Sequence, residues 1–111
     1  MCRRLADQLP QTVDAAERRA VSPDSPYVAA WGEPPIVLRC GVAKPAALQP
    51  TSELVTVNGV DWLPEPQEDG YRFTTTGRKA YVEVWVPDDY APEVNPLVDL
   101  AAPVAAAVPV A

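Results

Sequence analysis

The chain has 111 residues, of which 48% are apolar and 22% are charged. This length and composition fit one modest hydrophobic core, so we expect one extracytoplasmic domain over residues 1–111. The formal net charge of −6 and the scattered basic residues exclude a typical nucleic-acid-binding surface, because phosphates would be repelled. No run approaches the roughly 18 apolar residues of a membrane span, so we expect membrane attachment only through an N-terminal segment outside this chain.

An N-terminal helix is the first expected element. Only Pro10 interrupts its apolar pattern, and residues 13–19 are predicted to continue it. The pattern places Cys2 on the buried stripe of the helix. The residues at helical spacing are Cys2, Leu5, Ala6, Leu9 and Val13.

Fourteen prolines divide the middle of the chain into short strands, because each removes a backbone donor and disfavours helix. Strands are predicted at residues 27–31 and 36–42. In the second of these, Ile36 and Cys40 share one face, whereas Arg39 points to the other. Cys40 should therefore face the core.

The strongest hairpin signal is Asn58-Gly59, which accommodates the positive φ angles of a type I′ turn. Pro64 and Pro66 are expected to end the strand that follows this turn. Short connections between consecutive strands favour an antiparallel meander over a parallel sheet. The strands predicted in this part of the chain are residues 53–57, 60–63, 71–75 and 80–86.

The last strand indicates which face of the sheet is covered. Its alternating valines should meet the core, whereas the residues between them, Tyr81, Glu83 and Trp85, should line the other face. A C-terminal helix is then predicted, with Asn95 as N-cap and Pro96 at its first position. Pro103 should kink or shorten this helix, and the tail beyond residue 108 should fray.

The expected fold is therefore α+β. It has an antiparallel meander sheet of four or five strands, with the N- and C-terminal helices packed on one face, and one disulfide.

The disulfide is expected between Cys2 and Cys40, the only cysteines, because both fall on buried faces. Closing this span would restrict the unfolded chain by roughly 4 kcal/mol and would place the domain outside the reducing cytoplasm. Two reduced buried cysteines are the alternative. A zinc site would lack ligands, and a lipid-bearing Cys2 would lack the apolar segment that precedes such a site.

Residues for catalysis are scarce, since the chain has no histidine and its three serines lie in predicted loops without an evident base. Asp88-Asp89 lacks the spacing of a calcium loop. We therefore expect neither a catalytic site nor a metal or other cofactor. The remaining candidates for an acid/base pair, which could equally be solvated turn residues, are Asp61, Glu65, Glu68 and Asp69.

Several aromatic and arginine side chains, including Tyr71 and Arg72, are candidates for a binding surface. The predicted sheet places Arg39 on the open face together with the aromatic residues of the last strand. The alternative is that Trp62 or Trp31 completes the core and that Arg39 pairs with Glu83 or Asp61. The residues selected as binding candidates are Trp31, Arg39, Trp62, Tyr81, Trp85 and Arg78.

Four segments of the chain resemble the actinobacterial family known as the domain of unknown function DUF3515. They are Cys2–Leu5, Ala30–Gly41, Val60–Leu63 and Phe73–Arg78. The resemblance covers nearly the whole chain, and Trp31–Gly41 is its most specific part. It implies an exported domain behind an N-terminal hydrophobic anchor or lipoprotein signal, with no assigned activity. That segment is not part of this chain, so the type of anchor stays open.

We expect a noncatalytic, extracytoplasmic binding or scaffolding domain of the bacterial cell envelope, tethered to the membrane in the full-length protein. Its partner would be a cell-wall polymer or another envelope protein. One alternative is a carboxylate-dependent hydrolase or lyase acting on envelope material. Another is an assembly component that associates through an exposed strand edge. The sequence does not indicate the oligomeric state.

Overall fold

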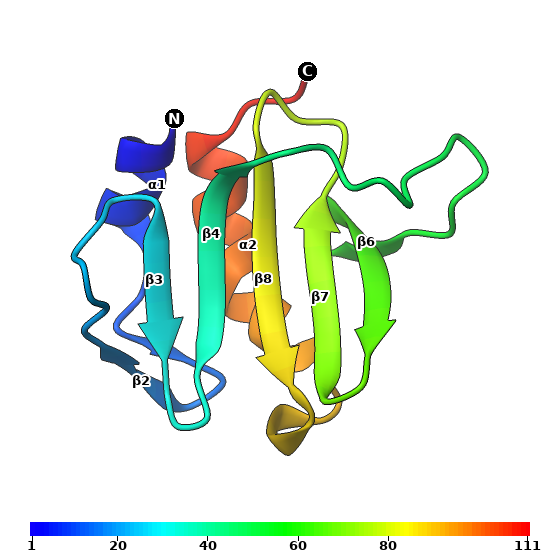
Figure 1. Ribbon diagram of the computed structural model, residues 1–111. Coiled ribbons are helices and arrows are strands. Elements are labelled where there is room, and N and C mark those ends of the chain that lie inside the picture. The colour runs from blue at the N-terminus through cyan, green and yellow to red at the C-terminus, as the bar shows by residue number, and fades with distance from the viewer.

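The computed structural model describes residues 1–111 and has an eight-stranded antiparallel sheet with two helices behind it (Figure 1). The strand order across the sheet is β1-β2-β3-β4-β8-β7-β6-β5, so two meanders meet where β4 pairs with β8. The elements in chain order are α1 (Cys2–Gln8), β1 (Thr12–Val13), β2 (Ala16–Arg19), β3 (Val28–Trp31), β4 (Ile36–Val42), β5 (Val55–Val57), β6 (Val60–Gln67), β7 (Gly70–Thr75), β8 (Tyr81–Pro87), the 3₁₀ turn η1 (Asp88–Tyr90) and α2 (Asn95–Ala107).

The predicted α+β class is confirmed, but the prediction of four or five strands was too low. The chain does not continue as a helix over residues 13–19 and instead forms the hairpin β1–β2. Its turn residues Asp14 and Ala15 have φ angles of 49° and 66°. Pro10 stops α1, and the backbone N–H of Asp14 donates to Asp99 Oδ2 of α2 at 2.8 Å. This contact joins distant parts of the chain, so the local pattern of apolar residues could not have predicted it.

The Asn58-Gly59 hairpin is confirmed as the turn between β5 and β6, with φ angles of 48° and 84°. The expectation that Pro64 and Pro66 end the second strand is wrong, because β6 continues to Gln67. β5 pairs only with the first three residues of β6, up to Trp62. The two prolines follow that point, on the part of β6 that has a partner strand on one side only, where a missing N–H is tolerated.

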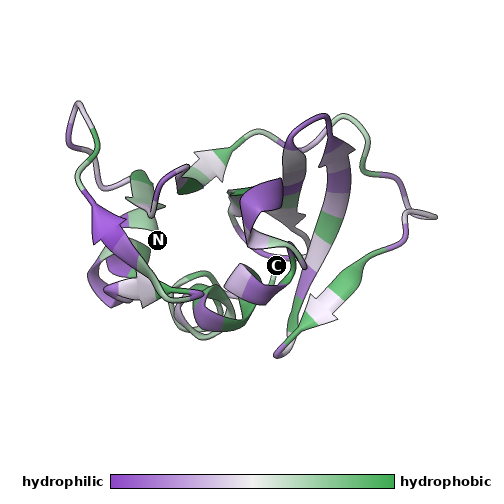
Figure 2. Cartoon of the chain, turned by 90° about the horizontal axis from the view of Figure 1, so that it is seen from below, coloured by the Kyte–Doolittle hydropathy of each residue, from purple (hydrophilic) through white to green (hydrophobic).

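The core lies between the sheet and the helices. The side chains of Val82, Val84 and Val86 are fully buried, as expected for the covered face of β8. They belong to one cluster of 19 buried residues that also takes in Phe73 of β7 and Leu100 of α2. Figure 2 shows the underlying alternation as hydrophilic and hydrophobic bands along single strands.

The disulfide is confirmed between Cys2 of α1 and Cys40 of β4, whose Cα atoms are 5.7 Å apart. It fastens α1 to the central part of the sheet, on the same side as α2, and the two helices pack against each other (Figure 1). A structural disulfide is consistent with a location outside the reducing cytoplasm. Neither helix is long and apolar enough to cross a membrane.

The C-terminal helix differs from its prediction at both ends. Asn95 lies in the first turn and makes no side-chain capping bond, because Val94 occupies the cap position. The helix runs through Pro103 to Ala107 instead of being shortened. Its buried apolar face outweighs the hydrogen bond that proline removes. The tail does not fray but is held to the β7–β8 turn, where Ala111 N–H donates to Gly77 O at 2.9 Å.

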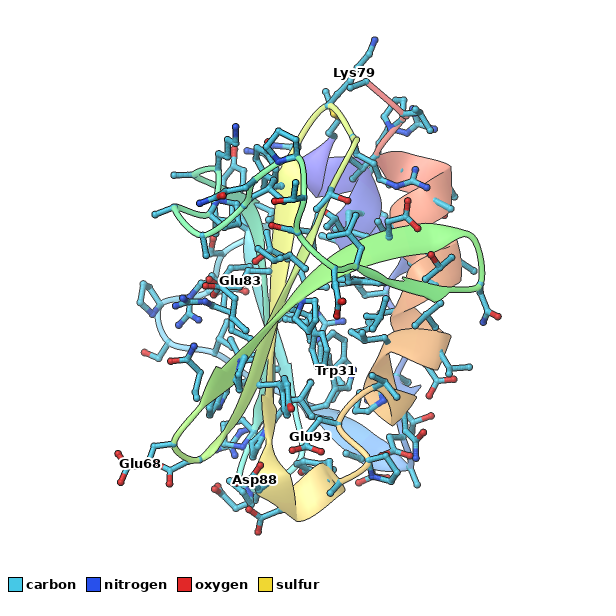
Figure 3. The ribbon with its side chains drawn as sticks, turned by 90° about the vertical axis from the view of Figure 1, so that its right-hand side faces the viewer. Trp31, Glu68, Lys79, Glu83, Asp88 and Glu93 are labelled. Carbon is cyan, nitrogen blue, oxygen red and sulfur yellow. A yellow bond between two sulfur atoms is a disulfide. The ribbon has the colours of Figure 1, made fainter.

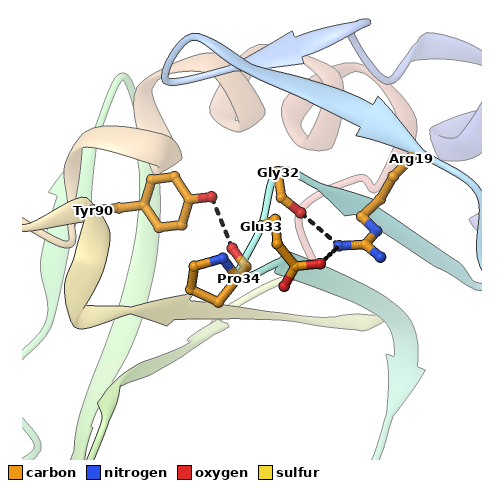
Figure 4. A network of polar contacts seen from close by, with 5 residues as sticks. All are labelled: Arg19, Gly32, Glu33, Pro34 and Tyr90. Carbon is orange, nitrogen blue, oxygen red and sulfur yellow. Dashed lines mark hydrogen bonds and ion pairs between the residues drawn. The ribbon is translucent and has the colours of Figure 1, made fainter.

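A polar network fixes the β3–β4 turn from two sides (Figure 4). The hydroxyl of Tyr90 in η1 donates to the carbonyl of Pro34 at 2.8 Å. From β2, Arg19 Nη1 donates to Gly32 O at 2.9 Å and to Glu33 Oε2 at 2.7 Å. Burial, and then nearby acidic groups, raise the pKa of Tyr90, so its hydroxyl remains a donor over the ordinary pH range.

Two carboxyl groups, Asp88 and Glu93, lie close together at the end of the sheet below β8 (Figure 3). A hydrogen bond to Glu93 raises the pKa of Asp88 above its ordinary value of 3.8. The native state therefore holds this proton more tightly than the unfolded chain does. The contribution of Asp88 to stability is fully present below its unfolded pKa and is lost as pH rises through the raised folded pKa.

We therefore expect Asp88→Asn, which keeps a hydrogen-bond donor without a charge, to melt at a higher temperature than the wild type near neutral pH. The difference should disappear below the ordinary Asp pKa. Melting curves across this pH range test the prediction. Asp24→Asn, at an exposed position, controls for the change in net charge, and a similar pH-dependent gain there would contradict a specific Asp88–Glu93 effect.

Candidate functional site

The sheet face opposite the helices carries a row of paired charges. Arg39 of β4 lies 3.6 Å from Glu83 of β8, and Arg72 of β7 lies 3.2 Å from Glu65 of β6. Each pair is directly opposed in the strand register. In Figure 3, Glu83 lies on the side of the sheet away from α2, whereas Trp31 lies on the α2 side. Of the two partners considered for Arg39, the structure selects Glu83.

The loop of residues 43–54 crosses one end of this open face (Figure 1). Its first residues line one side of a partly open cavity of about 420 Å³. A second hollow of about 370 Å³ lies beside it and shares Arg72 and Glu83 with it. The two together are called the open-face groove. The cavity under the loop is lined by Val42, Ala43, Pro45, Ala46, Ala47, Glu65, Arg72, Thr74 and Glu83, and the second hollow by Arg39, Gln67, Glu68, Asp69, Arg72, Glu83 and Trp85.

Within each ion pair, the carboxylate is the more buried partner. The Glu65 and Glu83 side chains are 17% and 19% exposed, whereas those of Arg72 and Arg39 are 42% and 50% exposed. Each arginine contacts its carboxylate through one nitrogen, which leaves most of its five N–H donors free. The hydrogen bond that Arg72 donates to Glu65 raises the pKa of Arg72. The groove therefore presents charged arginine side chains that have free N–H donors and are held in place by half-buried carboxylates.

The predicted open-face residues lie where the alternation placed them. Tyr81 and Trp85 alternate with the buried valines of β8 and are half-buried on the open face, where Arg39 is exposed. Of these residues, Arg39 and Trp85 line the groove.

The two other tryptophans, Trp31 and Trp62, are corrected from binding candidates to core residues, because both are fully buried. Trp31 ends β3 under the helices, where its Nε1 donates to Pro10 O at 3.0 Å and Arg18 stacks on its ring. Trp62 packs in the same core cluster. The sequence alternative in which tryptophans complete the core is the one found.

Arg78 has a structural position in the β7–β8 turn and does not line the groove. Its Nη1 donates to Val108 O at 2.8 Å, and its Nη2 donates to Gly59 O at 3.5 Å. It thereby links the end of α2 to the β5–β6 hairpin. This position was not predicted, because both acceptors are backbone atoms from other parts of the chain.

The four acidic candidates are separated. Asp61 accepts a hydrogen bond from Thr56 within the β5–β6 hairpin. Glu65 lies in the cavity under the loop, whereas Glu68 and Asp69 lie at the β6–β7 turn and line the second hollow. No group of three or more acidic or cysteine side chains is placed to hold a metal ion.

The roles of Glu65 and Glu83 in a shared groove were missed by the sequence reasoning. Strand alternation could have placed Arg72 on the face opposite Phe73, as it placed Trp85 opposite the valines. No local signal, however, indicates that residues 43–47 lie over these side chains. The roof of the cavity comes from a long connection whose course depends on the β4–β8 pairing.

Comparison with known proteins gives a family and no characterised relative. Nothing among curated proteins or solved structures matches this chain. One family, described as a protein of unknown function, matches over residues 1–111. The resemblance seen in the sequence is therefore confirmed, and the chain belongs to the DUF3515 family of proteins of unknown function.

Proposed function

We propose that this chain is a noncatalytic binding domain of the bacterial cell envelope, which contacts its partner through the open-face groove. The observation that carries the proposal is the combination of half-exposed Arg39 and Arg72 with a half-buried Trp85 beside a loop-roofed cavity. Arginine and tryptophan are typical anchors of binding surfaces. A rigid sheet holds such residues in fixed positions, where they can contact a partner.

The disulfide supports the extracytoplasmic part of the proposal. In the full-length protein, an N-terminal anchor or lipoprotein signal would tether the domain to the membrane. The partner would then be a cell-wall polymer or another envelope protein within reach of the tether.

A hydrolase or lyase using two carboxylates is the alternative, because Glu65 and Glu83 line one cavity. It has less support, since each carboxylate is already paired with an arginine and the chain has no histidine to act as a base.

Photo-crosslinking in the full-length protein tests the binding face. We expect p-benzoylphenylalanine at Trp85 to capture an envelope component reproducibly, because the position is part of the groove. The matched control is Val98, which is 51% exposed on α2, on the helical side of the molecule. Equal capture from both positions, or none from Trp85, would count against the open face as the binding surface.

Export is tested separately with a C-terminal alkaline phosphatase fusion, an enzyme that needs oxidised cysteines for activity. An active fusion is expected for the full-length protein. An inactive fusion that is nevertheless produced in full would argue for a cytoplasmic location.

A further inference from the structure

The cavity under the loop contains a buried acceptor with no partner. Glu65 Oε2 accepts from Arg72 Nη2, but Glu65 Oε1 is inaccessible to solvent and makes no hydrogen bond. Leaving a buried polar atom without a hydrogen bond costs free energy, because the atom has lost its contact with water. A ligand that brings a donor to this oxygen would recover part of that free energy. The site therefore favours a donor group next to Arg72.

Arg72 supplies the complementary half of the site. Only its Nη2 contacts Glu65, and its side chain is 42% exposed at the point where the two parts of the groove meet. Its remaining N–H groups are suited to a carboxylate, which guanidinium binds with matched geometry. An acceptor for Arg72 and a donor for Glu65 must lie close together in the ligand, because the two side chains are hydrogen-bonded to each other.

The loop that covers the cavity is free of hydrogen bonds to the residues below it, so a ligand can enter. Every hydrogen bond made by residues 43–54 is internal to the loop, such as Leu48 N–H to Pro45 O at 3.1 Å and Gln49 N–H to Ser52 Oγ at 2.9 Å. No hydrogen bond ties this loop to the charged floor. Its side chains over the floor are small ones from alanine and proline. Because the loop is not hydrogen-bonded to the floor, it can shift when a ligand enters the cavity.

The charges around the groove exclude simpler ligands. A polyanion would meet Glu68 and Asp69 at the second hollow and a chain of net charge −6. A simple cation would leave the free N–H donors of Arg72 unused. The cavity presents the Arg72 guanidinium beside the carboxylates of Glu65 and Glu83, so a ligand with groups of both signs can meet an opposite charge with each group. The cavity volume of about 420 Å³ lies within the usual range for small-molecule sites.

We propose that the cavity under the loop binds an α-amino acid group, with its ammonium on Glu65 and its carboxylate on Arg72. The ligand would be a free amino acid or a larger envelope molecule that displays such a group. This inference rests on the proposed function, because it names the ligand class for the same groove.

The test is an NMR titration of the purified chain with alanine. Alanine should shift the Nε–H resonance of Arg72 and the backbone amide resonances of Ala43, Ala46 and Ala47, and the shifts should reach saturation. N-acetylalanine keeps only the carboxylate and alaninamide keeps only the ammonium, so each should bind at least tenfold more weakly. Equal binding of all three probes, or no shift with alanine, would overturn the ligand class.

Variants assign the two contacts. Glu65→Gln should weaken alanine binding at least tenfold while leaving the weak binding of N-acetylalanine unchanged, and Arg72→Gln should weaken both. Arg19→Gln, which removes an arginine of the same 42% exposure from an ion pair outside the groove, should have no effect. Melting curves check that each variant folds, as expected where exposed ion pairs contribute little to stability. A loss of alanine binding in Arg19→Gln as large as that in Glu65→Gln would contradict the assigned contacts.

A parallel titration with N-acetylglucosamine oligomers separates this inference from the proposed function. If the oligomers shift the groove resonances and alanine does not, the groove binds glycans, the amino-acid inference fails and the proposed function stands. If neither probe shifts them and Trp85 captures nothing in the crosslinking experiment, both fail.

Discussion

Removing the Cys2–Cys40 disulfide is expected to lower the free energy of unfolding by about 4 kcal/mol, which is comparable to the entire stability of many small domains. The two cysteines are 38 positions apart, so the bond eliminates many extended conformations of the unfolded chain. It also joins α1 to the central strand β4, and α1 is a seven-residue helix that would not be stable alone. Without the bond, we expect α1 to detach first.

Urea unfolding of the oxidised and reduced domain measures this loss, and intact mass after alkylation reports the thiols. Oxidised protein should take up no alkylating reagent. The double variant Cys2→Ser, Cys40→Ser serves as the matched control, since its midpoint should equal that of the reduced wild type and should not respond to reductant. An unchanged midpoint on reduction would show that the bond contributes little to the fold.

Gly32→Ala is expected to destabilise the domain by about 2–5 kcal/mol, which combines left-handed backbone strain with overpacking. Gly32 has a φ of 77°, and an added Cβ would overlap the Tyr90 hydroxyl and approach the Ala16 Cβ to 2.9 Å. Tyr90 cannot simply withdraw, because its hydroxyl is bonded to Pro34 O at 2.8 Å. The substitution therefore disrupts the network in Figure 4 that joins β2, the β3–β4 turn and η1.

Two further variants separate the causes. Gly77 has a φ of 71° with nothing within 4 Å of an added Cβ, so Gly77→Ala should cost only the backbone term of about 1–2 kcal/mol. Combining Gly32→Ala with Tyr90→Phe removes the overlapping oxygen and should recover part of the loss as a favourable coupling. Equal losses in Gly32→Ala and Gly77→Ala, measured by urea unfolding, would refute the steric explanation.

The open-face groove is assembled from segments far apart in the sequence. Arg39 and Glu83 are on β4 and β8, which adjoin only because the two meanders meet there. Glu65 and Arg72, by contrast, belong to the neighbouring strands β6 and β7 of one hairpin. The groove thus combines a local pair with a long-range pair. The sequence named the long-range pair as one of two alternatives for Arg39, whereas the local pair, which turns and alternation could have indicated, was missed.

Some features of this protein were determined by the sequence itself, because they depend on local periodicity. Strand alternation separated the buried valines of β8 from Trp85, and Asn58-Gly59 specified the β5–β6 turn. The helical face of Cys2 and the strand face of Cys40 predicted the disulfide, with two reduced cysteines as the alternative, and the structure has the bond.

Other features were decided only by the tertiary structure. Residues 13–19 form a hairpin, because its turn is held by the distant helix α2, where Asp99 accepts a hydrogen bond from the backbone N–H of Asp14. Trp31 is in the core because the helices cover that side of β3, although its residue type suits a binding surface equally well. The loop over Glu65 takes its course from the β4–β8 pairing. In each case the contact that decides the structure joins segments far apart in the chain. Such a contact produces no periodic pattern of residues in either segment, so neither segment alone predicts it.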